Sequence, residues 1–347
     1  MGSELTSVRA ILGINPISGH DRLPPASRFK PAVATPHSHA ASIVHDGFRQ
    51  SEQQAAGPRH EHPLLSFLQV IPAESARDAG ALGYLAKFLV QTTLPHREHP
   101  GTQYVRQDGN LTLRISDVGG TGLPYGSYPR LILIWMTTEA ILTANRELEL
   151  GPSLSRFMAQ LGLQATGGHW GTIPRFRNQM QRLVGAAIST RWAQDDSGQD
   201  QCSGENLLLA DRFHLWWTPQ RLLSEAPAKS TVTLSVNFFE QLVAAPVPLD
   251  LRAVRALKRS PLALDLYAWA TRRVSYLSRP TLISWESFRR SFGAGYSDTP
   301  QGRSCFRSKA IEAFRRVVVV YPQLKIESHE NGLLLRPSGP HIPKVLR

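Results

Sequence analysis

The sequence predicts an α+β fold, mainly helical, in two tandem units that each end in a β-hairpin. Apolar residues recur at helical spacing in several segments, short alternating segments follow them, and this order occurs twice along the chain. Three helices followed by a hairpin is the order of a winged helix, whose third helix enters the DNA major groove. We therefore expect two tandem winged-helix domains, each with a helical core and a β-hairpin wing.

Composition divides the chain into an arm and two domains. Residues 1–62 are rich in Pro, His and Ala and lack apolar periodicity, which predicts a disordered arm. We expect a first winged-helix domain over 63–222, a candidate for DNA binding and dimerisation, and a second, strongly basic DNA-binding domain over 223–347. The formal net charge of +12 favours a polyanionic partner.

Several function classes are disfavoured. Two cysteines exclude a disulfide scaffold or a cysteine-based zinc site, and the histidine pairs at 37/39 and 60/62 fit scattered residues in a tail better than metal ligands. An ATPase would need a phosphate-binding loop, and a nickase would need a His-apolar-His pair with a tyrosine nucleophile. No apolar run is long enough for a membrane span, and no signal peptide is recognisable. We expect a cytoplasmic protein that is not an enzyme, has no catalytic residues, binds no cofactor or metal and contacts no membrane.

The elements of the first domain follow from hydrophobic periodicity. Leu111, Leu113 and Ile115 alternate with polar residues, which predicts a strand over 110–117. Its apolar side is either a dimer surface or part of the core, and the pattern favours neither. The helices expected next cover 128–144, 152–161 and 172–189, and the hairpin strands cover 188–193 and 206–217.

The helix over 172–189 carries a candidate DNA-reading face. Ile173, Phe176 and Met180 form its core face, while the other face is polar and basic, with no acidic residue over 172–189. Arg pairs with guanine, and Asn or Gln with adenine, so the residue types suit base reading. The alternative is a merely solvated basic face. The DNA-binding candidates of this domain are Arg175, Arg177, Asn178, Gln179, Arg182 and, in the hairpin, Arg191.

The second domain repeats the order and holds most of the excess charge. The expected strand covers 231–236, the helices cover 249–257, 261–277, 285–292 and 304–321, and the hairpin strands cover 324–327 and 333–336. Between Arg252 and Arg316 there are 14 Lys or Arg residues and four Asp or Glu residues. This density suits phosphate contacts at least as well as base reading. The candidates are Arg303, Ser304, Arg307, Ser308, Lys309, Arg315 and Arg316.

Several ordered motifs resemble the plasmid-encoded RepA family of replication initiators. The resemblance covers about 64–337. Its motifs are Leu82-Gly-Tyr-Leu-Ala86, Gly122-Leu-Pro-Tyr-Gly126, Pro129-Arg-Leu-Ile-Leu-Ile-Trp135, Gly151-Pro-Ser-Leu-Ser-Arg-Phe-Met158, Thr166-Gly-Gly-His-Trp-Gly-Thr172, Leu262-Ala-Leu-Asp-Leu-Tyr-Ala-Trp269 and Arg307-Ser-Lys-Ala310.

The resemblance implies a non-enzymatic initiator with two winged-helix domains. Such proteins bind directional repeats, called iterons, in double-stranded origin DNA, help to open the adjacent DNA and recruit the host helicase machinery, and thereby take part in plasmid copy control. A homodimer is expected away from iterons. The alternative is a winged-helix transcriptional regulator or autorepressor on an operator. Two unequal units in one chain favour a monomer on a directional repeat, whereas one unit per chain more often requires a dimer on a palindrome.

Overall fold

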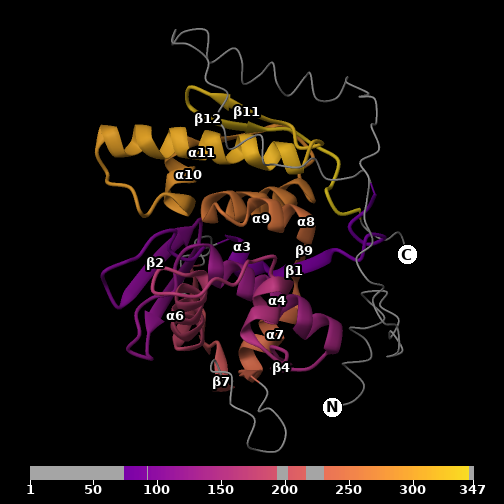
Figure 1. Ribbon diagram of the computed structural model, residues 1–347. Coiled ribbons are helices and arrows are strands. Elements are labelled where there is room, and N and C mark those ends of the chain that lie inside the picture. Colours follow the sequence, from indigo (N-terminus) through magenta and orange to yellow (C-terminus); the bar gives the residue numbers. More distant parts are fainter. Residues whose placement is uncertain (1–73, 92, 194–201, 216–229, 344–347) are drawn as a thin grey trace, which may run out of the picture.

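The computed structural model describes residues 74–91, 93–193, 202–215 and 230–343. The expected arm at 1–62 lies outside these ranges. The described chain is a mixed α/β structure, as expected, in which the elements of residues 82–250 and those of residues 251–335 form two stacked parts (Figure 1).

The first part is built around a four-stranded antiparallel sheet in the order β2-β3-β5-β6. Strand β3 lies inside the sheet, between β2 and β5, and its Leu113 and Ile115 are fully buried. The apolar side of the predicted strand 110–117 therefore belongs to the core. The elements up to residue 214 are β1 (Leu82–Ala86), α3 (Lys87–Gln91), β2 (Gln103–Asp108), β3 (Leu111–Asp117), α4 (Ser127–Thr143), β4 (Glu147–Glu149), α5 (Leu154–Gln160), α6 (Thr172–Val184), β5 (Ala186–Ala193), β6 (Cys202–Leu208) and β7 (Ala210–His214).

Helix α4 is the central helix of this part. It is apolar on almost every side, which is typical of a helix surrounded by other elements, and 11 of its 17 residues are buried. It packs against β1, α6, α7 and α9. Leu142, near the C-terminal end of the helix, is 47% exposed.

Helix α6 is shorter than predicted. It ends at Val184, and β5 begins at Ala186, so the expected helix over 172–189 was too long. Gly185 causes the change of direction because its carbonyl oxygen accepts hydrogen bonds from the amides of Val118 and Gly119. A Cβ at Gly185 would lie 3.2 Å from the Gln181 carbonyl oxygen, so a larger residue would crowd this junction.

The segment that follows residue 230 returns to the first part before the chain enters the second. Strand β8 (Thr231–Leu234) pairs with both β4 and β7. Helix α7 (Val236–Ala244) packs on α4, and β9 (Pro246–Asp250) pairs with β1, beside which Figure 1 shows it. The expected boundary at 222–223 lies outside the described residues. The division into two domains stays a prediction, but these three elements, assigned to the second domain, pack with the first.

The second part consists of a helical layer and a three-stranded antiparallel sheet in the order β10-β12-β11. Serine or threonine side chains cap three of its helices, as at α10, where the Ser284 hydroxyl accepts from the Ser287 amide. The predicted hairpin of strands 324–327 and 333–336 is present, and Glu330 and Asn331 form its two-residue loop. The elements are α8 (Leu251–Leu257), α9 (Pro261–Val274), β10 (Thr281–Ser284), α10 (Trp285–Phe292), α11 (Pro300–Val320), β11 (Ile326–His329) and β12 (Gly332–Leu335).

Candidate nucleic-acid interface

The exposed side of α6 is polar and free of negative charge. Arg175, Asn178 and Gln181 are exposed, whereas Phe176, Met180 and Leu183 are buried in the core. No Asp or Glu occurs anywhere from residue 150 to residue 194. A negatively charged polymer could therefore approach this face without repulsion from carboxylates on the same segment.

Gln179 does not lie on this face. It is only 4% exposed, and its Oε1 accepts a 2.8 Å hydrogen bond from the Tyr125 amide. Gln179 was a base-reading candidate, but the structure turns position 179 toward the loop before α4. Its amide satisfies the backbone of that loop, a frequent use of buried polar side chains.

Arg182 is also engaged within the protein. Its Nη2 lies 2.9 Å from Glu98 Oε1, its Nη1 donates to the Leu123 carbonyl, and its guanidinium lies 5.2 Å from the Tyr125 ring centre. The sequence pattern assigned it to the base-reading face, but its side chain holds the loop over 119–126 onto α6. Glu98, far away in the sequence, could not have been recognised as its partner.

The two other candidates of the first part lie in different surroundings. Arg177 is half-buried, whereas Arg191 is exposed on β5. Strand β5 follows α6 after a single residue, and Arg191 lies near the C-terminal end of this strand. The exposed candidates in the first part are therefore Arg175, Asn178 and Arg191.

A second basic face lies on the N-terminal half of α11. Ser304, Ser308 and Lys309 are exposed, and Lys309 Nζ lies 2.9 Å from Glu312. Arg303 is exposed and pairs with Asp298 at 2.9 Å. Because these ion pairs are exposed, their energetic contribution is small and both cations stay accessible to another anion.

Arg307 is positioned by contacts that the sequence did not reveal. Its guanidinium lies 5.2 Å from the centre of the Trp285 ring and donates to the His329 carbonyl oxygen, which also accepts from Trp285 Nε1. Residues from α10, α11 and β11 thus meet at one point. This arrangement fixes the basic side of α11 relative to the β11–β12 hairpin.

The last two candidates, Arg315 and Arg316, are half-buried. The Arg316 guanidinium lies 2.6 Å from Glu312 and its side chain is 18% exposed. Burial raises the pKa of Glu312, but Lys309 and Arg316 outweigh this effect and the pKa is lowered overall. Arg316 was a candidate phosphate contact, and in the structure its guanidinium is paired with this carboxylate.

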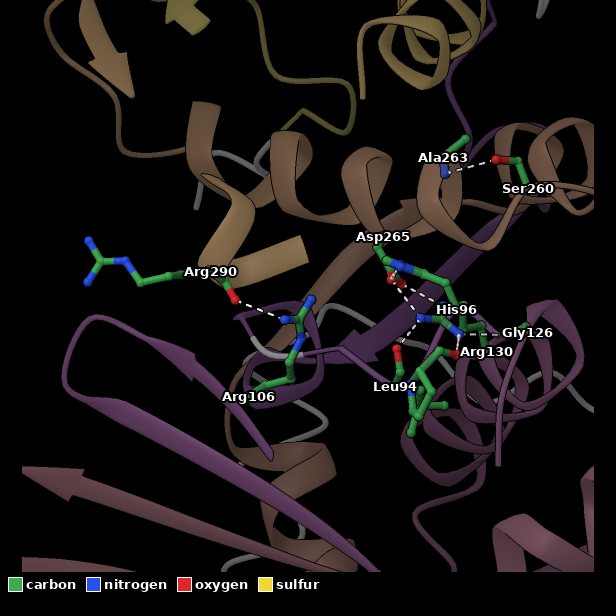
Figure 2. Close-up of polar contacts among 10 residues, drawn as sticks. Leu94, His96, Arg106, Gly126, Arg130, Ser260, Ala263, Asp265 and Arg290 are labelled. Carbon is green, nitrogen blue, oxygen red and sulfur yellow. Dashed lines mark hydrogen bonds and ion pairs between the residues drawn. The ribbon is translucent and has the colours of Figure 1, made fainter. Parts of the chain in front are cut away.

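A buried ion pair joins the two parts and sets the position of α9 against α4. Figure 2 shows Arg130 of α4 facing Asp265 of α9, with two N–H···O contacts of 2.8 Å each. Arg130 also donates to three main-chain carbonyls, of Leu94, Pro95 and Gly126, and His96 Nε2 lies 2.7 Å from Asp265. These contacts occupy the donors of the guanidinium, as a buried charge requires.

The pKa values within this cluster favour the ion pair. Burial raises the pKa of Asp265, but Arg130 and the His96 hydrogen bond lower it further, so the carboxylate stays ionised. Burial lowers the pKa of His96, which favours its neutral form. Nearby, Arg106 of β2 donates to the Arg290 carbonyl of α10 and adds a second contact between the two parts (Figure 2).

Metal-ligand clusters and membrane-spanning helices are both absent from the described residues. Within the ranges the structure describes, no group of three or more His, Cys, Asp or Glu side chains could hold a metal ion. None of the helices found there is both long and apolar enough to cross a bilayer.

Comparison with known families identifies the central part of the chain. Residues 123–287 match the family described as plasmid encoded RepA protein. This RepA-like region is slightly less than half of the chain and runs from the residues before α4 into α10, so it contains α6 and the Arg130–Asp265 pair. The resemblance inferred from the motifs is confirmed, and the match supports a replication initiator role.

Two solved structures are similar to this chain. The crystal structure of SeMet derivatives of domains 2 and 3 of RctB has 10% sequence identity and a TM-score of 0.48, covering 73% of this chain and 96% of that one. The crystal structure of RctB domains 2-3 has 10% identity and a TM-score of 0.44, covering 71% and 94%. No curated protein matches the chain.

Proposed function

We propose that this protein initiates plasmid replication by binding double-stranded origin DNA through two winged-helix domains, without catalysing a reaction. The observation that carries the proposal is the exposed, acid-free face of α6 inside the RepA-like region. Arg175 and Asn178 on this face have the side chains that recognise guanine and adenine edges. We assign them to base contacts, with Arg191 on the adjacent strand.

The arrangement of the second part supports a winged helix there. Its elements run helix α9, strand β10, helices α10 and α11, then the β11–β12 hairpin, with β10 paired to β12. In a helix-turn-helix unit of this type the last helix faces the DNA. We assign Arg303, Ser304, Arg307, Ser308 and Lys309 of α11 to DNA contacts, mainly with phosphate.

The first part supports a second such unit, with one irregularity. Helices α4, α5 and α6 precede the β5–β6 hairpin, as expected of a winged helix, but β4 pairs with β8 rather than with the hairpin. Two fused units of unequal charge suit a chain that reads a directional repeat as a monomer. We propose iterons as these repeats, with helicase recruitment and dimerisation as further properties expected of an initiator.

The test is a footprint of the wild-type chain on the origin and promoter DNA of the replicon that encodes it. Protection of several directional repeats, lost on Arg175→Ala/Asn178→Ala, is the expected result. Arg212→Ala, an exposed arginine on β7, is the matched control and should leave the footprint unchanged. Protection of a promoter palindrome alone would instead favour the transcriptional regulator.

A further inference from the structure

Trp170 is unusually exposed. Its side chain is 85% accessible, against 62% for Val118, the next most exposed large hydrophobic residue among those the structure describes. It lies in the turn between α5 and α6, immediately before the N-terminal end of α6. An exposed indole offers a large apolar contact area, and tryptophan is enriched at interfaces, so Trp170 is a candidate contact residue.

The turn that presents Trp170 is held firmly in place. The Thr166 amide donates to Thr172 Oγ1 at 2.8 Å, the Thr172 amide donates to Thr166 Oγ1 at 2.9 Å, and Thr172 Oγ1 donates to the Gln164 carbonyl at 2.6 Å. These reciprocal bonds close the base of the turn. The exposure of Trp170 is therefore built into a defined backbone conformation.

Two glycines make this conformation possible. Gly168 has a φ of +81°, in the left-handed region where other residues are strained. A Cβ at Gly171 would lie 2.3 Å from the carbonyl oxygens of Thr166 and Gly167, so only glycine fits there. With both glycines in place, the turn tightens beneath Trp170 and presents the indole away from the core.

The charge around Trp170 indicates the kind of partner. The Arg175 Nε donates to the Gly171 carbonyl at 3.2 Å, which holds its exposed side chain against the base of the same turn. The His169 ring is also exposed and lies edge-to-face with the indole at 4.7 Å. Since no carboxylate occurs from residue 150 to residue 194, the surface combines positive charge with one large aromatic side chain. That combination suits DNA, whose phosphates attract the cation while its bases and sugars offer apolar contact.

We propose that Trp170 is a DNA contact, with its indole packed against the bases or sugars of duplex DNA next to the phosphates near Arg175. This inference rests on the proposed function and deepens it, because it adds an apolar contact to the polar face of α6. The contact would add affinity without adding charge. It therefore differs from an arginine contact in a measurable way.

The test measures binding by fluorescence anisotropy, over a range of salt concentrations, to a labelled duplex that the wild-type chain recovers from a random-sequence pool. Trp170→Ala should weaken binding about tenfold, an effect typical of a lost aromatic contact to a base, with an unchanged salt slope. Arg303→Ala, which removes a proposed phosphate contact on α11, should weaken binding and reduce the salt slope by about one. Trp170→Phe should restore most of the affinity, and Leu142→Ala, an exposed apolar residue on α4, should have no effect.

The outcomes separate this inference from the proposed function. If the wild-type chain binds no duplex DNA, both are overturned. If the wild-type chain binds DNA and Trp170→Ala binds it equally well, only the role of Trp170 is overturned. This holds even if the variant changes self-association or binding to another protein. We expect the melting temperature of Trp170→Ala to be close to that of the wild type. A loss of affinity that is matched by a loss of melting temperature would also overturn the role of Trp170 in DNA binding.

Discussion

Arg130 and Asp265 are 135 residues apart in the sequence and meet through two parallel hydrogen bonds in the buried layer between α4 and α9. Arg130 is 5% exposed and Asp265 is 8% exposed. Helix α6 packs against α4 and helix α11 packs against α9, so the relative position of the DNA faces that they carry depends on this pair.

Removing one member of the pair should destabilise the protein strongly. Arg130→Met leaves the Asp265 carboxylate buried without its main partner, and a loss of about 3–5 kcal/mol in unfolding free energy is typical of such a change. Urea denaturation would measure it. The double variant Arg130→Met/Asp265→Leu should be clearly more stable than the sum of the single effects implies, since no charge stays uncompensated. Strictly additive effects would argue against a coupled pair.

His341 should make stability depend on pH. Burial lowers its pKa to about 4, its Nδ1 lies 2.8 Å from the Tyr267 hydroxyl, and its ring stacks on Tyr321. Protonation therefore favours the unfolded chain, in which the histidine pKa is near 6.5. The stability present above that pH should fall by about 3 kcal/mol as the pH drops to 4.

The measurement is unfolding free energy against pH for the wild type and His341→Gln. The variant should show a shallower fall between pH 6.5 and pH 4. Some fall should persist because the pKa of buried His96 is lowered as well. Identical curves would contradict the role assigned to His341.

Gln179 should matter for folding rather than for DNA. Gln179→Ala leaves the Tyr125 amide without its acceptor, and an unpaired buried group costs about 1–3 kcal/mol. Gln181→Ala, an exposed glutamine on the same helix, is the matched control and should leave stability within about 0.5 kcal/mol. Equal stability of the two variants in urea denaturation would show that the buried contact is unimportant.

The two ends of α11 should respond differently in DNA titrations over salt. Arg303→Ala and Arg307→Ala should each reduce the slope of log affinity against log salt by about one, as lost phosphate contacts do. Arg316→Ala should leave the slope unchanged but lower the unfolding free energy, because Glu312 loses a partner. A reduced slope for Arg316→Ala would mean that this arginine reaches DNA.

Periodicity alone predicted most of the helices. The boundaries of α10 and the position of the last hairpin were predicted closely, because the spacing of apolar residues and the turn sequence are local signals. Strand β2 was not predicted, since its pairing with β3 is a tertiary relationship and its own residues show little alternation. Helix α6 was predicted too long because apolar residues continue at helical spacing beyond Gly185 into β5.

The candidate site was predicted less completely than the fold. Residue type indicated Arg175 and Asn178, which are exposed. The same reasoning also included Gln179 and Arg182, because a helical pattern does not reveal that Tyr125 and Glu98 approach from distant segments. The exposure of Trp170 was equally hidden, as it depends on the hydrogen bonds that close its turn.

Strand β8 has a practical consequence for dissecting this protein. It fills the space between β4 and β7, although both precede it and it is joined to β7 by a long stretch of chain. A fragment ending at residue 222 would therefore leave two strand edges open, and open edges promote association with other chains. Expressing the N-terminal piece alone should therefore yield aggregates.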